Sequence, residues 1–356
     1  MNVIDYFLEL AAFDNVHPNE AEILNYIKSK LDSFGLKHSQ DSFGNIVALI
    51  SSTSETSVAL CGHVDIAAPL RGRKIIRRDN IIKTDGKSLL GGDDKTAVAA
   101  MLWLAEQISS AQLVTAKSVE LIFTTGEEAG MMGAKNIDYS HIKSDDILVF
   151  DWLGRVNRII VKSPAYIKLD VSYTGRTAHP AEWQKGINAG QFLLQAASTL
   201  QQGEYKKGVT FNIGRFRYGE ARNQVSGFAE LEAEVRAFDL NEASSAAEEI
   251  SKVFEDIASK HSIKCAVSLD ADSAALELNT SSKLVTKITR SLAELNLEPY
   301  FEETFGCFDA NIFAGKGKNV VVLGGAYYNP HGPEEYVNID ELYELCDFIG
   351  HFCCKK

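Results

Sequence analysis

The pattern of helices and strands changes character twice along the chain, and this change most constrains the fold. In the first part, segments with apolar residues at helical spacing alternate with short β-rich runs at residues 46–50, 58–61 and 119–124. Between the last two runs lies an alanine-rich segment, residues 95–108, which is predicted to be a helix. Strands that alternate with helices favour an α/β layer architecture with a mixed, partly parallel sheet.

From about residue 163 the chain follows a different pattern. Predicted strands and helices occur there in the order β-α-β-β-α-β, which is the split unit of a ferredoxin-like domain. After about residue 272 the α/β pattern resumes. We therefore predict an α/β domain of residues 1–162 and 272–356, with a smaller α+β domain of residues 163–271 inserted into it. The predicted elements of the insert are residues 166–173, 191–200, 209–213, 229–237, 242–260 and 264–269.

Composition and charge exclude several classes of protein. The chain has 356 residues, of which 45% are hydrophobic and 24% charged, as in an average soluble globular protein. Its net charge of −12 argues against nucleic acid or an anionic membrane as the main partner, because both need a positive face. No apolar run approaches the length of about eighteen residues that suggests a membrane span, and no signal peptide is recognisable. The cysteines show neither disulfide nor metal spacing, so a reducing, cytoplasmic location is expected.

Histidines and acidic residues gather in five short segments at or near the ends of predicted strands. Loops at the carboxyl ends of strands are where α/β proteins usually build their sites. Together the segments offer two histidines and a surplus of carboxylates, which zinc, cobalt and manganese accept as ligands. The segments are residues 62–65, 91–95, 125–128, 150–151 and 329–332.

Each segment taken alone also has an ordinary structural interpretation. His63 and Asp65 at a strand end are a common arrangement, although their spacing points both side chains the same way and lets the aspartate orient the imidazole. Asp151 follows an apolar run, where an unpaired carboxylate would be costly. His331 could be a surface histidine in a loop. The joint occurrence of these segments, each at a strand edge, favours a metal site.

Two pairs of adjacent acids add to this pattern. Asp93 and Asp94 would by default cap a helix, and Glu127 and Glu128 would by default form a charged turn. Adjacent carboxylates can instead divide the work, with one binding a metal and the other acting as a base.

These motifs resemble those of the peptidase T-like metallopeptidases. That family lies within a larger group that includes aminoacylases, acetylornithine deacetylase and succinyl-diaminopimelate desuccinylase. The resemblance spans most of the chain in the order of the family. The matching stretches are residues 62–65, 84–95, 125–128, 133–134, 175–179, 212–215, 223–236, 309–311 and 331–335.

The resemblance implies a centre of two divalent metal ions, most readily zinc, with cobalt or manganese as alternatives. Asp93 would bridge the ions, since the family ligand is the acid two residues before the lysine, here Lys95. Asp65 would orient His63, and Glu127 would act as the general base. The implied metal ligands are His63, Asp93, Glu128, Asp151 and His331.

The inserted domain resembles the lid and dimerisation domain of the family, which implies a homodimer. His179 resembles the residue that reaches a neighbouring active site and stabilises the oxyanion. Asn223 and Arg236 resemble lid groups that hold the substrate. The guanidinium of Arg236 suits a two-pronged contact with a substrate carboxylate.

Three positions depart from the family pattern near the implied site. Phe308 stands where the family has serine or threonine, and this bulky ring is expected to reshape the pocket. Trp152 follows the ligand Asp151 where small polar residues are usual. Glycine follows His331 where threonine is common.

The expected function is metal-dependent hydrolysis of an amide bond, in an exopeptidase that acts on short peptides as an aminopeptidase or tripeptidase. An N-acyl amino acid deacylase of the same superfamily is the alternative, because it would use the same metals and a carboxylate clamp. A rival of a different class is a catalytically silent homologue that binds a small molecule or a protein. Such a homologue would be expected to lose Glu127 or a ligand, and all of these residues are present.

Overall fold

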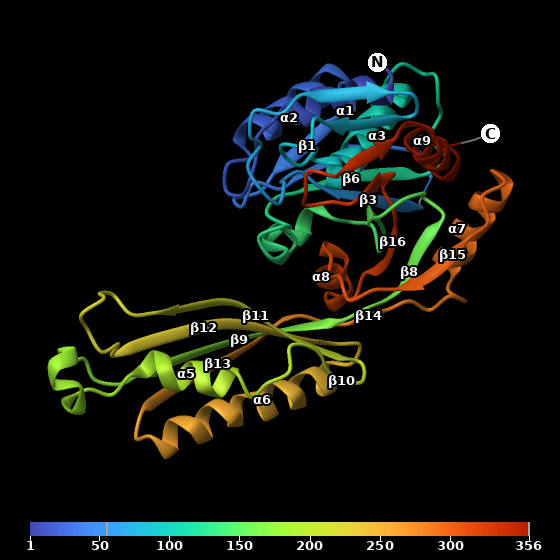
Figure 1. The fold of residues 1–356 in the computed structure, drawn as a ribbon. Helices are drawn as coiled ribbons and strands as arrows, with labels where there is room; N and C mark the ends of the chain where they lie inside the picture. Colours follow the sequence, from blue (N-terminus) through green and yellow to red (C-terminus); the bar gives the residue numbers. More distant parts are fainter. Residues whose placement is uncertain (55, 355–356) are drawn as a thin grey trace. The chain divides into compact units, whose positions relative to one another are not determined.

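The computed structural model describes residues 1–54 and 56–354, and the chain divides into two compact units (Figure 1). The first unit comprises Met1–Val161, Leu278–Glu303 and Phe308–Lys356, and the second comprises Lys162–Glu277 and Thr304–Cys307. Each unit has its own hydrophobic core. The elements confirm the predicted fold class, a split α/β fold with a mixed central sheet and an inserted ferredoxin-like α+β fold.

The central sheet of the first unit is parallel in its middle and antiparallel towards its edges. β3 (Ser57–His63) lies between β6 (Ser118–Thr124) and β7 (Asp146–Trp152) and runs parallel to both, while β16 (Asn319–Gly324) runs parallel to β7. Strands buried on both faces become nearly continuous apolar runs, which is why these segments were recognisable in the sequence. The order is β1-β2-β6-β3-β7-β16-β8-β14, in which β14 (Leu276–Glu277) pairs with the end of β8, and β15 also pairs with β8. The outer strands are β1 (Lys37–Gln40), β2 (Ile46–Ile50), β8 (Arg158–Ser163) and β15 (Tyr300–Glu303).

A small antiparallel sheet of the first unit has no counterpart in the sequence prediction. Its order is β17-β18-β5-β4, and β4 and β5 form a hairpin with Asp79 in the left-handed region at φ 52°. β18 pairs with β5, so the chain that follows β5 lies beside the chain that precedes β18. This pairing joins two segments that are distant in sequence. The strands are β4 (Ile75–Arg78), β5 (Ile81–Thr84), β17 (Tyr327–Tyr328) and β18 (Tyr336–Asn338).

The alanine-rich helix α3 packs against β3 and β7 of the sheet and against helices α1, α2 and α9. Asn338 caps the last helix, because its side chain accepts hydrogen bonds from the backbone N–H groups of Asp340 and Glu341. Among the described residues, no helix is both long enough and apolar enough to span a membrane. The helices are α1 (Val3–Ala11), α2 (Ala21–Ser33), α3 (Gly92–Ser109), α4 (Met132–Asn136), α7 (Lys283–Glu294), α8 (Asp309–Gly315) and α9 (Ile339–Cys353).

The second unit is an antiparallel sheet with two helices on one face (Figure 1). Its strand order is β10-β11-β12-β9-β13, and α5 and α6 cover the face that carries the core. The other face is more open and carries charged side chains such as Lys168, Glu230 and Glu232. The elements are β9 (Ala165–Thr174), α5 (Ala189–Ala197), β10 (Gly203–Lys206), β11 (Val209–Tyr218), β12 (Phe228–Ala237), α6 (Leu240–Lys260), β13 (Lys264–Ser273) and β14 (Leu276–Glu277).

Candidate metal centre

The strand ends of the first unit bring the predicted metal ligands to one edge of the central sheet. His63 is the last residue of β3, Glu128 follows β6, and Asp151 lies near the end of β7. Since β3, β6 and β7 are parallel neighbours, their carboxyl ends meet at the same edge. Asp93 comes from the start of α3 and His331 from the loop after β17.

The carboxylate of Asp93 lies between the two histidines. Its Oδ1 is 3.1 Å from Nε2 of His63, and its Oδ2 is 3.2 Å from Nε2 of His331. The same nitrogen of His331 is 3.0 Å from Oε1 of Glu128, and Nε2 of His63 is 3.8 Å from Oδ1 of Asp151. One side chain therefore faces both ends of the cluster, which is the arrangement expected of a bridging carboxylate.

Two groups of side chains present possible ligand atoms within 4.8 Å of one another. One group is His63, Asp93 and Glu128, and the other is His63, Glu127 and Asp151. Glu127, predicted as the base, thus has an oxygen within 4.8 Å of a ring nitrogen of His63. Asp94 belongs to neither group, and its Oδ2 would lie 2.8 Å from a Cβ placed on Gly62.

The cluster concentrates negative charge in a buried place. Burial raises the pKa of Asp151 and of Glu128, and repulsion from the Asp93 carboxylate raises both further. Hydrogen bonds to Asp93 and Glu128 raise the pKa of His331 to about 10, so a positive charge is favoured between the carboxylates. A group of buried carboxylates is stabilised when a cation compensates its negative charge. Imidazole nitrogens and carboxylate oxygens are ligands that divalent metal ions such as zinc accept. The residues present therefore fit divalent metal ions.

Asp65 holds a second part of the cluster together. It is fully buried, and its Oδ1 lies 3.4 Å from Nδ1 of His63, on the side of the ring away from Asp93. Its two oxygens also accept hydrogen bonds from the backbone N–H groups of Glu127 (3.0 Å) and Glu128 (3.1 Å). One aspartate is thus positioned to orient an imidazole and to fix the loop that carries both glutamates.

Supporting residues that the sequence analysis did not identify come from the segment after α1. The side-chain amide of Asn15 donates a hydrogen bond to the Val64 carbonyl, between His63 and Asp65. The ring of His17 packs on Gly126, where a Cβ would lie 2.7 Å from Nδ1 of His17. Gly126 also has a φ of 61°, so this tight turn before the two glutamates favours glycine. No motif in the sequence signals these contacts.

The two bulky residues that depart from the family pattern pack against each other. The rings of Trp152 and Phe308 meet edge to face with centroids 5.9 Å apart. Nε1 of Trp152 donates a hydrogen bond of 2.8 Å to Glu302, and Phe308 is buried. Both rings are therefore held in place beside the strand end that carries Asp151.

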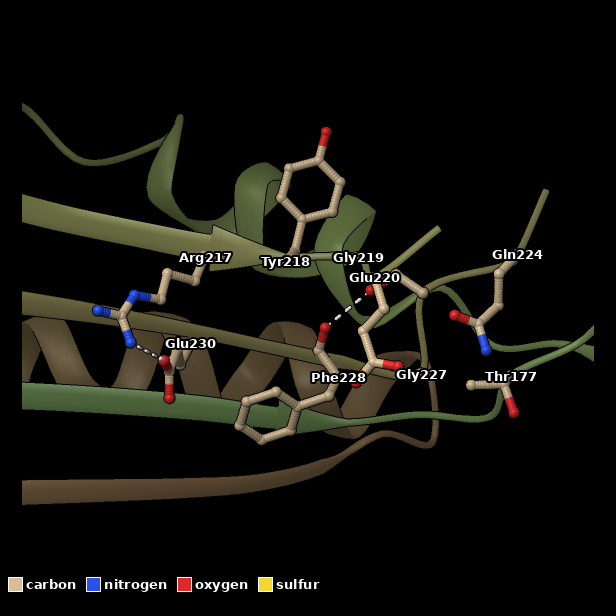
Figure 2. Close-up of a pocket in the computed structure, with 10 residues that line it drawn as sticks. Thr177, Arg217, Tyr218, Gly219, Glu220, Gln224, Gly227, Phe228 and Glu230 are labelled. Atoms are coloured by element: carbon tan, nitrogen blue, oxygen red, sulfur yellow. Dashed lines mark hydrogen bonds and ion pairs between the residues drawn. The ribbon is translucent and has the colours of Figure 1, made fainter. Parts of the chain in front are cut away.

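The predicted substrate residues all belong to the second unit. The backbone N–H of Val225 donates a hydrogen bond to the Ala178 carbonyl, so the segments that carry Asn223 and His179 lie side by side. Both of these residues are exposed. Figure 2 shows Thr177 and Gln224, their near neighbours in sequence, beside a hollow of about 280 Å³ at this end of the sheet.

Arg236 lies at the opposite end of β12 from this hollow. Eight residues of extended chain separate it from Phe228, which corresponds to roughly 26 Å at the usual rise of a strand. Its guanidinium donates hydrogen bonds to the Phe305 carbonyl (2.7 Å) and to Glu234 (2.9 Å), and it lies over the ring of Tyr166. Within one copy of the second unit, Arg236 is therefore not gathered with His179 and Asn223.

Comparison with known proteins gives matches over most of the chain. Residues 89–355 match the description of peptidase family M20/M25/M40. The chain is similar to the crystal structure of a tripeptidase from Staphylococcus aureus, with 28% identity, 98% of this chain and 96% of that chain covered, and a TM-score of 0.89. It is similar to aminopeptidase PepT from Bacillus cereus, with 25% identity, the same coverage of both chains and a TM-score of 0.84. Protein YqjE of Bacillus subtilis is 28% identical over 98% of this chain and 96% of that protein.

Proposed function

This chain belongs to peptidase family M20/M25/M40 and is a hydrolase of amide bonds, and we propose that it is a dinuclear metal-dependent exopeptidase for short peptides. The observation that carries the proposal is the placement of Asp93 between His63 and His331, with one oxygen 3.1 Å and the other 3.2 Å from an imidazole nitrogen. The similarity to a tripeptidase and to an aminopeptidase supports a peptidase T-like aminopeptidase or tripeptidase as the specific activity.

The proposed centre holds two divalent ions, zinc by preference, with cobalt or manganese as alternatives. His63 and Asp151 would bind one ion, Glu128 and His331 the other, and Asp93 both. The chemistry that such ions supply is polarisation of the scissile carbonyl and activation of water. The support for this division is that each oxygen of Asp93 faces a different histidine.

Glu127 is the proposed general base. A carboxylate in this position would take a proton from the attacking water and pass it to the leaving amine. Its backbone N–H is fixed by Asp65, which also lies against His63, so the base and a metal ligand share one support. Shared support keeps the base at a constant distance from the reacting groups.

The second unit is the proposed lid and dimerisation domain. Arg236 would bind a substrate carboxylate, whereas His179 and Asn223 would serve the metal centre of a neighbouring copy in a homodimer. The length of β12 between Arg236 and Phe228, which lines the hollow near His179 and Asn223, supports this assignment, because roughly 26 Å exceeds the length of a dipeptide or tripeptide in contact with one centre. The proposed location of the protein is the cytoplasm.

The test of the proposed function is amine release by protein that has been stripped with a chelator and reconstituted with zinc, cobalt or manganese. The substrates are a panel of dipeptides, tripeptides and N-acetyl amino acids, and the control is the variant Glu127→Ala. Metal-dependent cleavage of peptides is the expected result. Cleavage of the N-acetyl amino acids alone would replace the exopeptidase by an N-acyl amino acid deacylase. No release with any metal from protein that binds two ions would contradict both activities for these substrates.

A further inference from the structure

We infer that Glu335 is a positioning residue that fixes the bridging carboxylate of Asp93 through the backbone of residues 90–93. The inference rests on the proposed function in one respect, namely that Asp93 and His331 bind metal. Glu335 lies four residues after His331, in the segment between β17 and β18. It is 1% exposed and has no place among the groups of possible metal ligands in the described part of the chain.

Four consecutive backbone N–H groups donate hydrogen bonds to the carboxylate of Glu335. Its Oε2 accepts from Leu90 (2.6 Å) and Gly91 (2.8 Å). Its Oε1 accepts from Gly92 (2.6 Å) and Asp93 (3.1 Å). Successive N–H groups that converge in this way form a concave site for an anion. Both oxygens are therefore occupied by the loop, and Glu335 acts on Asp93 through its backbone.

The shape of the loop depends on its two glycines. Gly91 has a φ of 78°, in the left-handed region. A Cβ on Gly92 would lie 2.9 Å from Cγ2 of Val337 and 3.1 Å from Oε1 of Glu335. A larger residue at either position would prevent the N–H groups from converging on the carboxylate.

The side chain of Arg73 binds the carbonyl groups of the same loop. The guanidinium of Arg73 donates hydrogen bonds to the carbonyls of Leu89 (2.6 Å) and Leu90, and another to the carbonyl of Ala11. The carbonyl groups of the loop thus meet a positive side chain, and its N–H groups meet a negative one. This arrangement leaves the Asp93 side chain little freedom to move away from the two histidines.

The position of Glu335 also couples the two sides of the metal centre. The segment 331–335 touches Asp93 at both ends, through the ring of His331 (3.2 Å) and through the Glu335 carboxylate (3.1 Å). The distance between the ligands Asp93 and His331 is therefore set by one short segment. Loss of the Glu335 bonds would loosen the bridging ligand without removing any atom that binds metal.

The test compares Glu335→Gln with Glu334→Gln, the same change in the exposed residue one position earlier. The glutamine amide would keep one oxygen but would present N–H groups to two of the four donors. For Glu335→Gln we expect metal affinity, measured by competition with a chelator, to fall about 10- to 100-fold, as is usual when a residue that supports a ligand is changed. We also expect faster hydrogen exchange of the amides of residues 90–93. Glu334→Gln should match the wild type in both.

Several outcomes would overturn the inference. One is unchanged metal affinity in folded Glu335→Gln, and another is an equal loss of affinity in Glu334→Gln. If Glu335→Gln does not fold, Glu335→Asp replaces it, because it keeps the charge and shortens the reach. Unchanged affinity and unchanged exchange in Glu335→Asp would then contradict the inference. Absence of metal binding by the wild type would contradict the proposed function instead, while the exchange of residues 90–93 would still test the anchor.

Discussion

The two units hold their predicted functional residues in opposite ways. In the first unit the side chains converge, with possible ligand atoms within 4.8 Å of one another and with buried carboxylates fixing the loops that carry them. In the second unit His179 and Asn223 are exposed, and Arg236 lies near the end of β12 that is distant from the hollow beside them. The difference teaches that the groups proposed for the chemical step are gathered within one unit, whereas the groups proposed to bind the substrate are distributed over a surface.

The largest effect is expected from a change to Glu127, the proposed base in the cluster of the first unit. We expect Glu127→Ala to reduce kcat about 10³-fold, in the middle of the range for a general base, while two metal ions remain bound. The matched control is Glu128→Ala, which should lose metal because Glu128 lies 3.0 Å from His331 in the cluster. Turnover assays and metal counting on the same samples provide the measurement. Loss of metal from Glu127→Ala would make Glu127 a ligand.

Removal of metal should affect the first unit more than the second. Without a bound cation, the carboxylates of Asp93, Glu128 and Asp151 repel one another in a buried place. At free metal roughly a hundred times the Kd, binding should stabilise the folded state by about 2.7 kcal/mol. Differential scanning calorimetry before and after treatment with a chelator would measure the shift in Tm. An unchanged Tm, with activity lost, would mean that repulsion among these carboxylates does not destabilise the metal-free protein.

Mixing two variants would test whether Arg236 and His179 serve different metal centres. If Arg236 serves its own metal centre and His179 serves that of a partner, Arg236→Ala and His179→Ala should each have low activity alone. An equal mixture that exchanges subunits should recover about a quarter of the wild-type rate, because half the dimers are mixed and each has one complete centre. Rate measurements over time after mixing would test this. No recovery, in a mixture shown to exchange subunits, would place both residues at one centre.

The smallest effect is expected from charge pairs on the open face of the second unit. Arg215 and Glu232 lie 2.8 Å apart, with side chains 53% and 49% exposed. We expect Arg215→Ala to change the free energy of unfolding by less than about 0.5 kcal/mol, since exposed pairs contribute little. Urea denaturation would measure the change. A loss of more than about 2 kcal/mol would show that this face is organised as tightly as the candidate metal centre.

The sequence was most informative where a local pattern determines structure. Apolar runs identified the strands of the central sheet, and the motifs at their ends identified the residues that gather around Asp93. The hairpin of β4 and β5 was missed because residues 75–84 mix charged and apolar side chains, and only one of β5's isoleucines, Ile82, is buried. The extra edge strand β10 was missed because its four residues carry no strong apolar signal.

Contacts between distant residues explain what the sequence could not provide. Residues 331–335 were part of the resemblance to the family. The role inferred for Glu335, however, depends on hydrogen bonds from N–H groups that lie 242 to 245 residues earlier in the chain, which no local pattern reveals. The contact of His17 with Gly126 is likewise invisible in a local pattern. The second unit illustrates a different case, because the proposed roles of His179 and Asn223 involve a second copy of the chain.

The anchor of the Asp93 loop also has a consequence for biosynthesis. The ribosome makes Asp93 long before it makes Glu335, and 242 positions separate them. At about 5–20 residues per second, the loop waits on the order of 10–50 s for the side chain that fixes it. A chain released before residue 335 would therefore contain most of the proposed ligands but would lack the side chain that fixes the loop of Asp93. A nascent chain can therefore acquire the complete proposed metal centre only after residue 335 has been made.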